Sequence, residues 1–199
     1  LVASGTQTIC VMAPSGTGKS ALLAFWAHEH RHLHPETLVV EHYVGATDSA
    51  QDHVGLMLRV INEIRALYDV QQEPPDTADS IERDFPAWLA YARGRTLVLV
   101  IDAVNQLPGH AAELHWLPAF IPPDVRIVIS TTEGPSLNAL RERDFTMLEV
   151  HPLSESQRAT VIERFLSDYR KRLSPEQLSR IVGDDKSRNP LFLRTVLEE

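Results

Sequence analysis

The feature that most constrains this chain is a glycine-rich segment near its start, Ala13-Pro14-Ser15-Gly16-Thr17-Gly18-Lys19-Ser20. It follows a short apolar run, 9–12, and precedes a helix-like run, 21–27. Gly16 and Gly18 let the backbone curl so that successive N–H groups point inward, where they can bind phosphate oxygens. The start of the next helix adds unpaired N–H groups and the positive end of its dipole. This order of strand, loop and helix predicts a phosphate-binding loop, or P-loop.

The residue types of the loop predict a nucleotide site that uses Mg²⁺. We expect Lys19 to reach the β- and γ-phosphates and to serve catalysis, and the Ser20 hydroxyl to ligate Mg²⁺. The usual first glycine is replaced by Ala13, which is tolerable if its φ stays negative. The alternative is a glycine-rich turn with an exposed lysine. The residues predicted to contact the nucleotide here are Pro14, Ser15, Gly16, Thr17, Gly18, Lys19, Ser20 and Ala21.

Length and charge narrow the class of protein. The chain has 199 residues, enough for one domain or for one domain and a small second one. Its formal net charge of −8 argues against broad attraction to nucleic acid or to an anionic membrane. No stretch has the length and apolarity of a membrane span, and no signal peptide is evident. The chain begins with Leu1 and ends in a helix-like run, 195–199, so we interpret it as an excerpt of a longer protein.

The single cysteine indicates the compartment. Cys10 lies in the first predicted strand and cannot form a disulfide within the chain. We interpret it as a small core residue in a reducing environment, and we therefore expect a cytoplasmic protein.

Apolar and β-branched runs alternate with helical patterns over the first three quarters of the chain. Continuous apolar runs such as 97–101 are typical of strands covered on both faces in a parallel sheet. Asp48 or Ser49 is expected to cap the second helix. The alternation predicts a doubly wound α/β sheet. The predicted strands are 7–12, 37–44, 96–102, 125–131 and 145–150, and the predicted helices between them are 18–34, 54–68 and 79–92.

After His151-Pro152 the pattern changes to helices alone. Ser154 is expected to cap the first of these helices, and Pro175 to occupy the first position of the second. A third helix is expected to begin near Asn189-Pro190. The change of pattern predicts a separate helical region at this end of the chain.

Polar residues at two strand ends are candidates for the chemistry. Asp102 ends an apolar strand downstream of the P-loop, where a carboxylate can hold the Mg²⁺ of a bound nucleotide, directly or through water. The alternative is an aspartate that caps the next turn. Ser130, Thr131 and Thr132 end the next strand and could face the γ-phosphate or the attacking water; an ordinary polar strand end is the alternative.

Four segments together resemble one family. They are the P-loop, the acidic strand with its continuation 97–107, the segment 42–46 (His-Tyr-Val-Gly-Ala) and the segment 188–193 (Arg-Asn-Pro-Leu-Phe-Leu). The chain resembles NACHT-type signal-transduction NTPases of the STAND branch of AAA+ proteins, of the nephrocystin-3 and telomerase-associated-protein type. The resemblance covers nearly the whole chain.

The resemblance implies a three-layer α/β/α P-loop NTPase fold with a five-stranded parallel sheet in the order 5-1-4-3-2. It implies a nucleotide-binding core, 1–152, and a small helical lid, 153–199, with Pro190 near the adenine base. It also implies ATP or ADP with Mg²⁺ as ligands, and winged-helix and sensor domains beyond this chain. The implied role is a nucleotide-dependent switch, with self-association of the full-length protein and protein partners bound by further domains.

Two departures from the family pattern predict slow hydrolysis. Many relatives carry a further acid shortly after the Mg²⁺ aspartate, whereas Asn105 and Gln106 stand here. An amide such as that of Asn105 can orient water but cannot accept a proton. The segment 130–133 also lacks the arginine common in NACHT relatives.

Other functions remain open at this point. The segment 28–32 satisfies H-E-x-x-H, a zinc protease signature with His28 and His32 as ligands and Glu29 as base. It lies at the end of a predicted helix and lacks an evident third ligand, so we expect no stoichiometric zinc. A nucleotide-binding scaffold without hydrolysis and a small-molecule kinase, with Arg188 and Arg194 as lid arginines, are further alternatives. The absence of an Asn-Lys-x-Asp pattern disfavours guanine.

Overall fold

The computed structural model describes residues 6–46 and 52–198. The strands are β1 (Thr8–Met12), β2 (Leu38–Tyr43), β3 (Leu97–Asp102), β4 (Val125–Thr131) and β5 (Thr146–Glu149). The α-helices are α1 (Lys19–Leu33), α2 (His53–Leu67), α3 (Ala78–Leu89), α4 (Pro135–Arg141), α5 (Glu155–Asp168), α6 (Pro175–Gly183) and α7 (Pro190–Glu198). The short 3₁₀ helices within these described residues are η2 (Val104–Gln106), η3 (Gly109–Glu113) and η4 (Asp185–Arg188).

The five strands form one parallel sheet in the order β2-β3-β4-β1-β5. This is the predicted order 5-1-4-3-2 read from the other edge, so the fold prediction is confirmed. All six residues of β3 are buried, as its continuous apolar sequence predicts for a strand covered on both faces. Because the strands are parallel, their carboxyl ends meet at one edge of the sheet, and the predicted Asp102 and Thr131 lie there.

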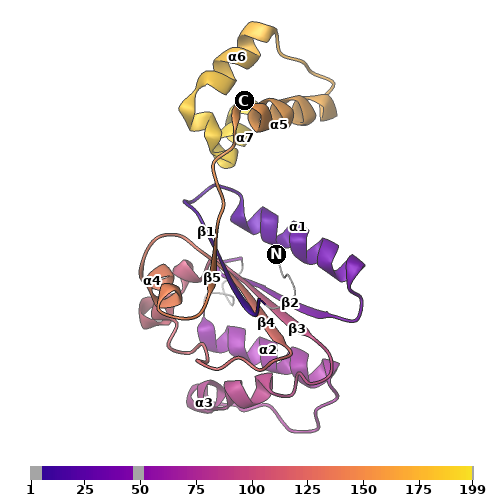
Figure 1. The fold of residues 1–199 in the computed structure, drawn as a ribbon, viewed down its shortest axis with the longest axis vertical. Coiled ribbons are helices and arrows are strands. Elements are labelled where there is room, and N and C mark those ends of the chain that lie inside the picture. The colour runs from indigo at the N-terminus through magenta and orange to yellow at the C-terminus, as the bar shows by residue number, and fades with distance from the viewer. Residues whose placement is uncertain (1–5, 47–51, 199) are drawn as a thin grey trace. The chain divides into compact units, whose positions relative to one another are not determined.

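Helices cover both faces of the sheet, with α1 on one face and the pair α2 and α3 on the other (Figure 1). Helix α2 buries side chains at helical spacing, which gives it one apolar face. Helix α3 adds Phe85 and Trp88 to the same core. The caps predicted for α2, Asp48 and Ser49, lie outside the described residues. Asp52 caps this helix, because its carboxylate accepts from the N–H groups of Val54 and Gly55, both at 3.2 Å.

Helix α4 was not among the predicted elements. It begins with Pro135 in its first turn, after Gly134, whose φ of 140° lies in the left-handed region. It buries Leu137 and Leu140. Two buried leucines in seven residues are too short a pattern to show helical periodicity, so the proline after glycine was the only local signal.

Contacts divide the chain into two compact units. One, the α/β unit, comprises residues up to Met12 together with Lys19–Glu149. The other, the helical unit, comprises Ala13–Gly18 together with Val150–Glu199. The P-loop residues before Lys19 therefore group with the C-terminal helices rather than with the sheet.

The helical unit is built from well-capped helices around a small core. The core consists of the buried residues Ile162, Leu166 and Leu193, with partly buried side chains packed around them. Ser154 and Ser174 form capping boxes with glutamines three residues later, and Pro175 follows Ser174 at the first helical position. The predicted starts of α5 and α6 are therefore confirmed.

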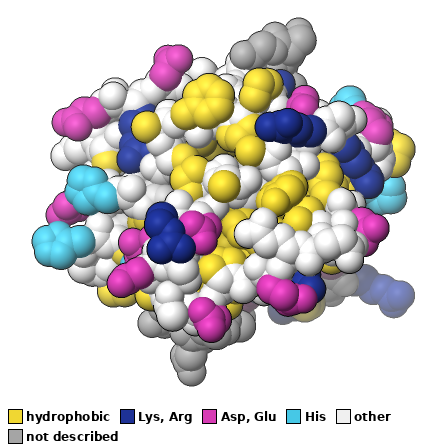
Figure 2. All heavy atoms as spheres, turned by 90° about the horizontal axis from the view of Figure 1, so that it is seen from below, with side chains coloured by type: hydrophobic (Ala, Val, Ile, Leu, Met, Phe, Trp, Pro, Cys, Tyr) yellow, Lys and Arg dark blue, Asp and Glu magenta, His cyan; other side chains and the backbone are white. Residues whose placement is uncertain are grey.

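One face of the molecule, on the side of α2 and α3, is shown in Figure 2. Hydrophobic side chains gather near its middle, and acidic and basic side chains alternate around them without forming one continuous basic patch (Figure 2). Within 6–46 and 52–198, no helix is both long enough and apolar enough to cross a membrane.

Candidate functional site

The carboxylate of Asp102 is held at the end of β3. Its residue is 4% exposed, and Ser130 donates a hydrogen bond from Oγ to Asp102 Oδ1. The Ser130 hydroxyl also accepts from the N–H of Ala103, at 2.9 Å. Ala103 has a φ of 58°, which turns the chain sharply just after the strand. The Ser130 hydroxyl on β4 therefore holds both the Asp102 carboxylate and the turn that follows β3 at Ala103.

Lys19 begins α1 in the same unit as Asp102 and is 8% exposed. Burial lowers the pKa of Lys19 below its ordinary value, and the carboxylate of Asp102 acts in the opposite direction, raising the pKa. Desolvation disfavours the charged form of an amine, so a nearby anion stabilises it. A nearby anion therefore stabilises the charged form of Lys19, and this is what a lysine that binds phosphate requires.

The two amides after β3 contact the neighbouring strand ends. Asn105 Oδ1 accepts from the N–H of Thr132, at 3.2 Å, just beyond β4. The side chain of Gln106 lies against Gly45 beyond β2: a Cβ on Gly45, whose φ is 80°, would be 2.5 Å from Gln106 Oε1. The segments 42–46 and 97–107, singled out separately in the sequence, therefore meet at this edge of the sheet.

Thr131 was predicted to have a catalytic role. It is fully buried, and its hydroxyl donates to the Thr132 carbonyl oxygen at 3.1 Å. Its catalytic role stays a prediction. Ser130, one residue earlier, is the partner of Asp102, which was not predicted. The strand register, which pairs Ile101 with Ile129, brings the two together and cannot be read from either segment alone.

The P-loop residues have the backbone that their sequence predicts. Gly16 and Gly18 have φ values of 78° and 89°, which residues with a Cβ rarely adopt. Thr17 closes the turn by donating from Oγ1 to the Pro14 carbonyl oxygen, at 2.8 Å. Ala13 is not among the described residues with positive φ, so alanine is accommodated where the P-loop pattern has its first glycine.

The P-loop contacts the start of α7 within the helical unit. Asn189 Nδ2 donates to the Ser15 carbonyl oxygen at 3.0 Å, and the N–H of Leu191 donates to that of Gly16 at 3.2 Å. Pro190, predicted to lie near the adenine, occupies the first position of α7 between these two residues. Asn189 itself was not predicted; an asparagine before a proline that begins a helix is the signal that could have found it.

The H-E-x-x-H segment lies in the last turns of α1, which ends at Leu33. The rings of His28 and His32 pack edge to face with centroids 4.7 Å apart. Among the residues that the structure describes, no three His, Cys, Asp or Glu side chains are grouped so that they could hold a metal ion. The absence of zinc stays a prediction for metal analysis.

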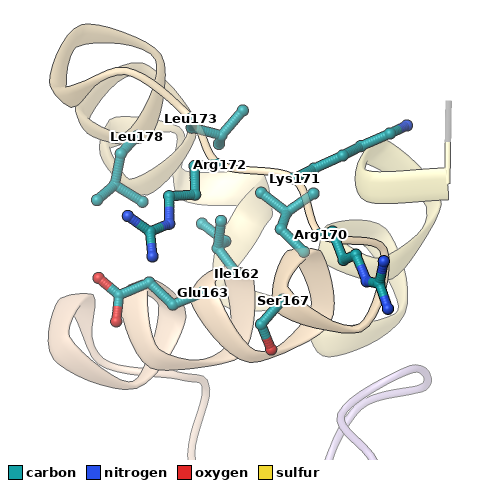
Figure 3. A pocket seen from close by; sticks show the side chains of 9 residues that line it. Ile162, Glu163, Ser167, Arg170, Lys171, Arg172, Leu173 and Leu178 are labelled. Carbon is teal, nitrogen blue, oxygen red and sulfur yellow. The ribbon is translucent and has the colours of Figure 1, made fainter.

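A separate pocket of about 700 Å³ lies within the helical unit, between α5 and α6 (Figure 3). Both aliphatic and charged side chains line it, and the charged ones include Arg170, Lys171 and Arg172 (Figure 3). It contains none of the predicted site residues, so it is distinct from the groups described above.

Comparison with known proteins identifies first the fold and then the family of this chain. The chain resembles the structure of a Walker-type ATPase of Pyrococcus abyssi, with a TM-score of 0.63 and 11% identity over 98% of this chain and 63% of that one. Domain III of the replication initiation protein DnaA of Thermotoga maritima gives a TM-score of 0.58 and 14% identity, over 98% and 75%. At these identities the likeness shows the fold, that of P-loop NTPases.

The NACHT domain family model matches residues 7–169, so the chain belongs to the NACHT family. A TPR repeat-containing protein of Dictyostelium discoideum is 28% identical over 95% of the chain. Nephrocystin-3 of Mus musculus is 26% identical over 85%, and NACHT domain- and WD repeat-containing protein 1 of Homo sapiens 28% over 96%. The chain spans 14%, 13% and 13% of these proteins, respectively, about one seventh of their length. It is a NACHT P-loop NTPase module.

Proposed function

We propose that this chain binds ATP or ADP with Mg²⁺ and acts as a nucleotide-dependent switch that hydrolyses ATP slowly. The observation that carries the proposal is the buried pair of charged residues in the α/β unit, Lys19 and Asp102. Lys19 directly follows the glycine loop in the chain, and Asp102 is held at a strand end by Ser130. A buried amine and a buried carboxylate at these two motif positions are the groups that phosphate and Mg²⁺ chemistry requires.

The side chains fit the ligands that the family implies. Ser20 and Asp102 offer a hydroxyl and a carboxylate oxygen, the donor types that Mg²⁺ prefers, and we assign the metal to them. Mg²⁺, when bound, neutralises charge on the phosphate oxygens. Lys19 binds the phosphates as a cation, and the backbone of 14–21 supplies N–H donors. Pro190 is proposed to pack near the adenine.

Slow hydrolysis is supported by the contacts of the two amides. The oxygen of Asn105 already accepts from Thr132, and Gln106 is turned against Gly45. Neither amide can accept a proton at neutral pH. A general base typically contributes about 10²–10⁴-fold to a rate, so its absence keeps the nucleotide bound for longer. We propose that this persistence is the basis of the switch.

Binding is tested by calorimetry with ADP and ATP in the presence of Mg²⁺. Lys19→Ala removes a charge-assisted hydrogen bond to phosphate and should weaken binding by about 10- to 100-fold. Lys171→Ala removes an exposed lysine in the helical unit and serves as the matched control, with no change expected. Equal affinity of the wild type and Lys19→Ala would overturn the assignment.

Hydrolysis is tested by measuring steady-state turnover with saturating ATP. We expect wild-type turnover well below the order of 1 s⁻¹ common in enzymes. Asn105→Asp keeps an oxygen that can accept from the Thr132 N–H and adds a carboxylate, so it should raise the rate. Brisk wild-type turnover would contradict the proposal, and no hydrolysis at all would favour the scaffold alternative.

We also propose a wider role for the full-length protein. The family resemblance supports self-association of the full-length protein through this module and protein partners bound by further domains. The cytoplasmic location expected from the sequence stays a prediction. Sedimentation of the full-length protein with ADP and with ATP would test self-association, and identical oligomeric states would contradict a nucleotide-dependent switch of assembly.

A further inference from the structure

Asn189 makes hydrogen bonds in two directions at once. Its Oδ1 accepts from the N–H groups of Leu191, at 2.9 Å, and Phe192, at 3.3 Å, which caps the first turn of α7. Its Nδ2 donates to the carbonyl oxygen of Ser15 in the P-loop, 174 residues away in the chain. The next loop carbonyl, that of Gly16, accepts from the Leu191 N–H. Two consecutive peptide carbonyls of the P-loop are therefore held by the start of α7.

The same contact uses the space above Gly16. A Cβ built on Gly16 would lie 2.7 and 2.8 Å from the amide atoms of Asn189 and 3.1 Å from the Cβ of Leu191. Contacts this close do not occur between real side chains without displacement of a neighbour. Besides adopting a positive φ, Gly16 therefore leaves the space that the Asn189 amide occupies.

Asn189 is in turn fixed to the rest of the helical unit. Helix η4 leads directly into it and is anchored by Arg158, which is 5% exposed. Arg158 Nη1 donates to the hydroxyl of Ser187 at 2.9 Å and to the carbonyl oxygen of Asp184 at 3.2 Å. On the other side of Asn189, Leu193 is fully buried in the small helical core. A displacement of Asn189 would therefore disturb buried hydrogen bonds and apolar contacts on both sides.

We propose that Asn189 is a positioning residue that couples the P-loop to helix α7 through the loop carbonyls. The loop backbone that binds phosphate and the hydrogen-bonded contact between the loop and α7 then stabilise each other. By linkage, a nucleotide that favours this loop conformation also favours the contact between the loop and α7. That contact in turn raises nucleotide affinity by the same factor. The inference rests on the proposed nucleotide binding, but not on any contact between Asn189 and the nucleotide.

Two substitutions separate the coupling from the helix cap. Asn189→Ser keeps a favoured capping oxygen but has no amide to reach Ser15. Asn189→Asp also keeps oxygens that can cap and loses the donor. Both variants should therefore retain α7 in the nucleotide-free protein. Asn62→Ser, at an exposed asparagine of α2, is the matched control.

The experiment measures ADP affinity by calorimetry and hydrogen exchange of the α7 amides, with and without Mg²⁺-ADP, on the full chain. One hydrogen bond contributes a net amount that corresponds to an affinity loss of about 2- to 10-fold, which we expect for both Asn189 variants. In the wild type, ADP should slow exchange in 191–194. In both variants most of this protection should be lost, while exchange in α5 without nucleotide stays unchanged.

The outcomes distinguish the coupling from the nucleotide site. If Lys19→Ala loses ADP binding while both Asn189 variants bind and protect α7 as the wild type does, the coupling is wrong and the proposed function stands. A lowered melting temperature of the variants with unchanged ADP affinity would reduce Asn189 to a structural role and also overturn the coupling. If the wild type itself binds no ADP, both the function and the coupling are refuted.

Discussion

The two units of this protein hold their functional residues by different means. In the α/β unit, Asp102 and Ser130 stand at the ends of strands buried in a continuous apolar core. In the helical unit, three buried apolar residues form the core. Asn189 is held there by its hydrogen bonds to the P-loop and to α7, and the preceding η4 is held by hydrogen bonds from Arg158. Hydrophobic burial is non-directional and large in total, whereas single hydrogen bonds contribute about 1 kcal/mol each. A single substitution or a lost hydrogen bond should therefore perturb the local structure of the helical unit more readily than that of the sheet.

The largest expected effect lies in the core of the α/β unit. Phe85→Ala should lower the free energy of unfolding of this unit by about 3–5 kcal/mol, because it leaves a cavity in a closely packed core. Phe120→Ala removes the same side chain where the residue is 74% exposed and should change the stability by no more than about 0.5 kcal/mol. Denaturant titration followed by tryptophan fluorescence checks both. Equal losses in the two variants would contradict the burial argument.

A smaller effect is expected in the core of the helical unit. Leu193→Ala should destabilise this unit by about 2–3 kcal/mol, at the low end of the range for such a truncation, because a small core collapses around the gap more easily. Hydrogen exchange should rise in α5 and α7 and stay unchanged in β3 and β4. Leu191→Ala, at a 60% exposed position of the same helix, is the control. Faster exchange throughout the sheet would show that the two units unfold together.

The polar anchor of the helical unit should contribute less than its core. Arg158→Met keeps most of the buried volume but removes the donors to Ser187 and Asp184, which should cost about 1–3 kcal/mol. Arg164→Met, on the exposed side of the same helix, should have little effect. Exchange of the amides in 185–192 measures the result. A stability gain in Arg158→Met would mean that burying the guanidinium costs more than its hydrogen bonds contribute.

The smallest effect concerns the thiol in β1. Burial raises the pKa of Cys10 to about 11, so at pH 8 the thiol is almost entirely protonated. Because the thiolate is the reactive form, alkylation should be about 10²-fold or more slower than for a free cysteine, and should rise with pH up to the raised pKa. Phe85→Ala should speed labelling, and Leu193→Ala should leave it unchanged. Faster labelling in Leu193→Ala would contradict independent opening of the units.

Much of the architecture was predictable because its signals are local. The glycine loop, the apolar strand ending in Asp102 and the serine caps at Ser154 and Ser174 each occupy a few consecutive residues, and their physical requirements can be assessed one segment at a time. The order of the strands was also predicted, but only through the family resemblance. Helix α4 was missed because it is too short to show a period.

The sequence by itself determined which residue types are available for phosphate and Mg²⁺ and where the chain alternates between strand and helix. Only the tertiary structure decided which of them meet: Ser130 with Asp102 across two strands, Gln106 with Gly45, and Asn189 with Ser15 and Gly16. These contacts join residues far apart in the chain, and a hydrogen bond depends on ångström-scale distance and direction. Strand register and helix packing set those quantities, and no short pattern of residues contains them.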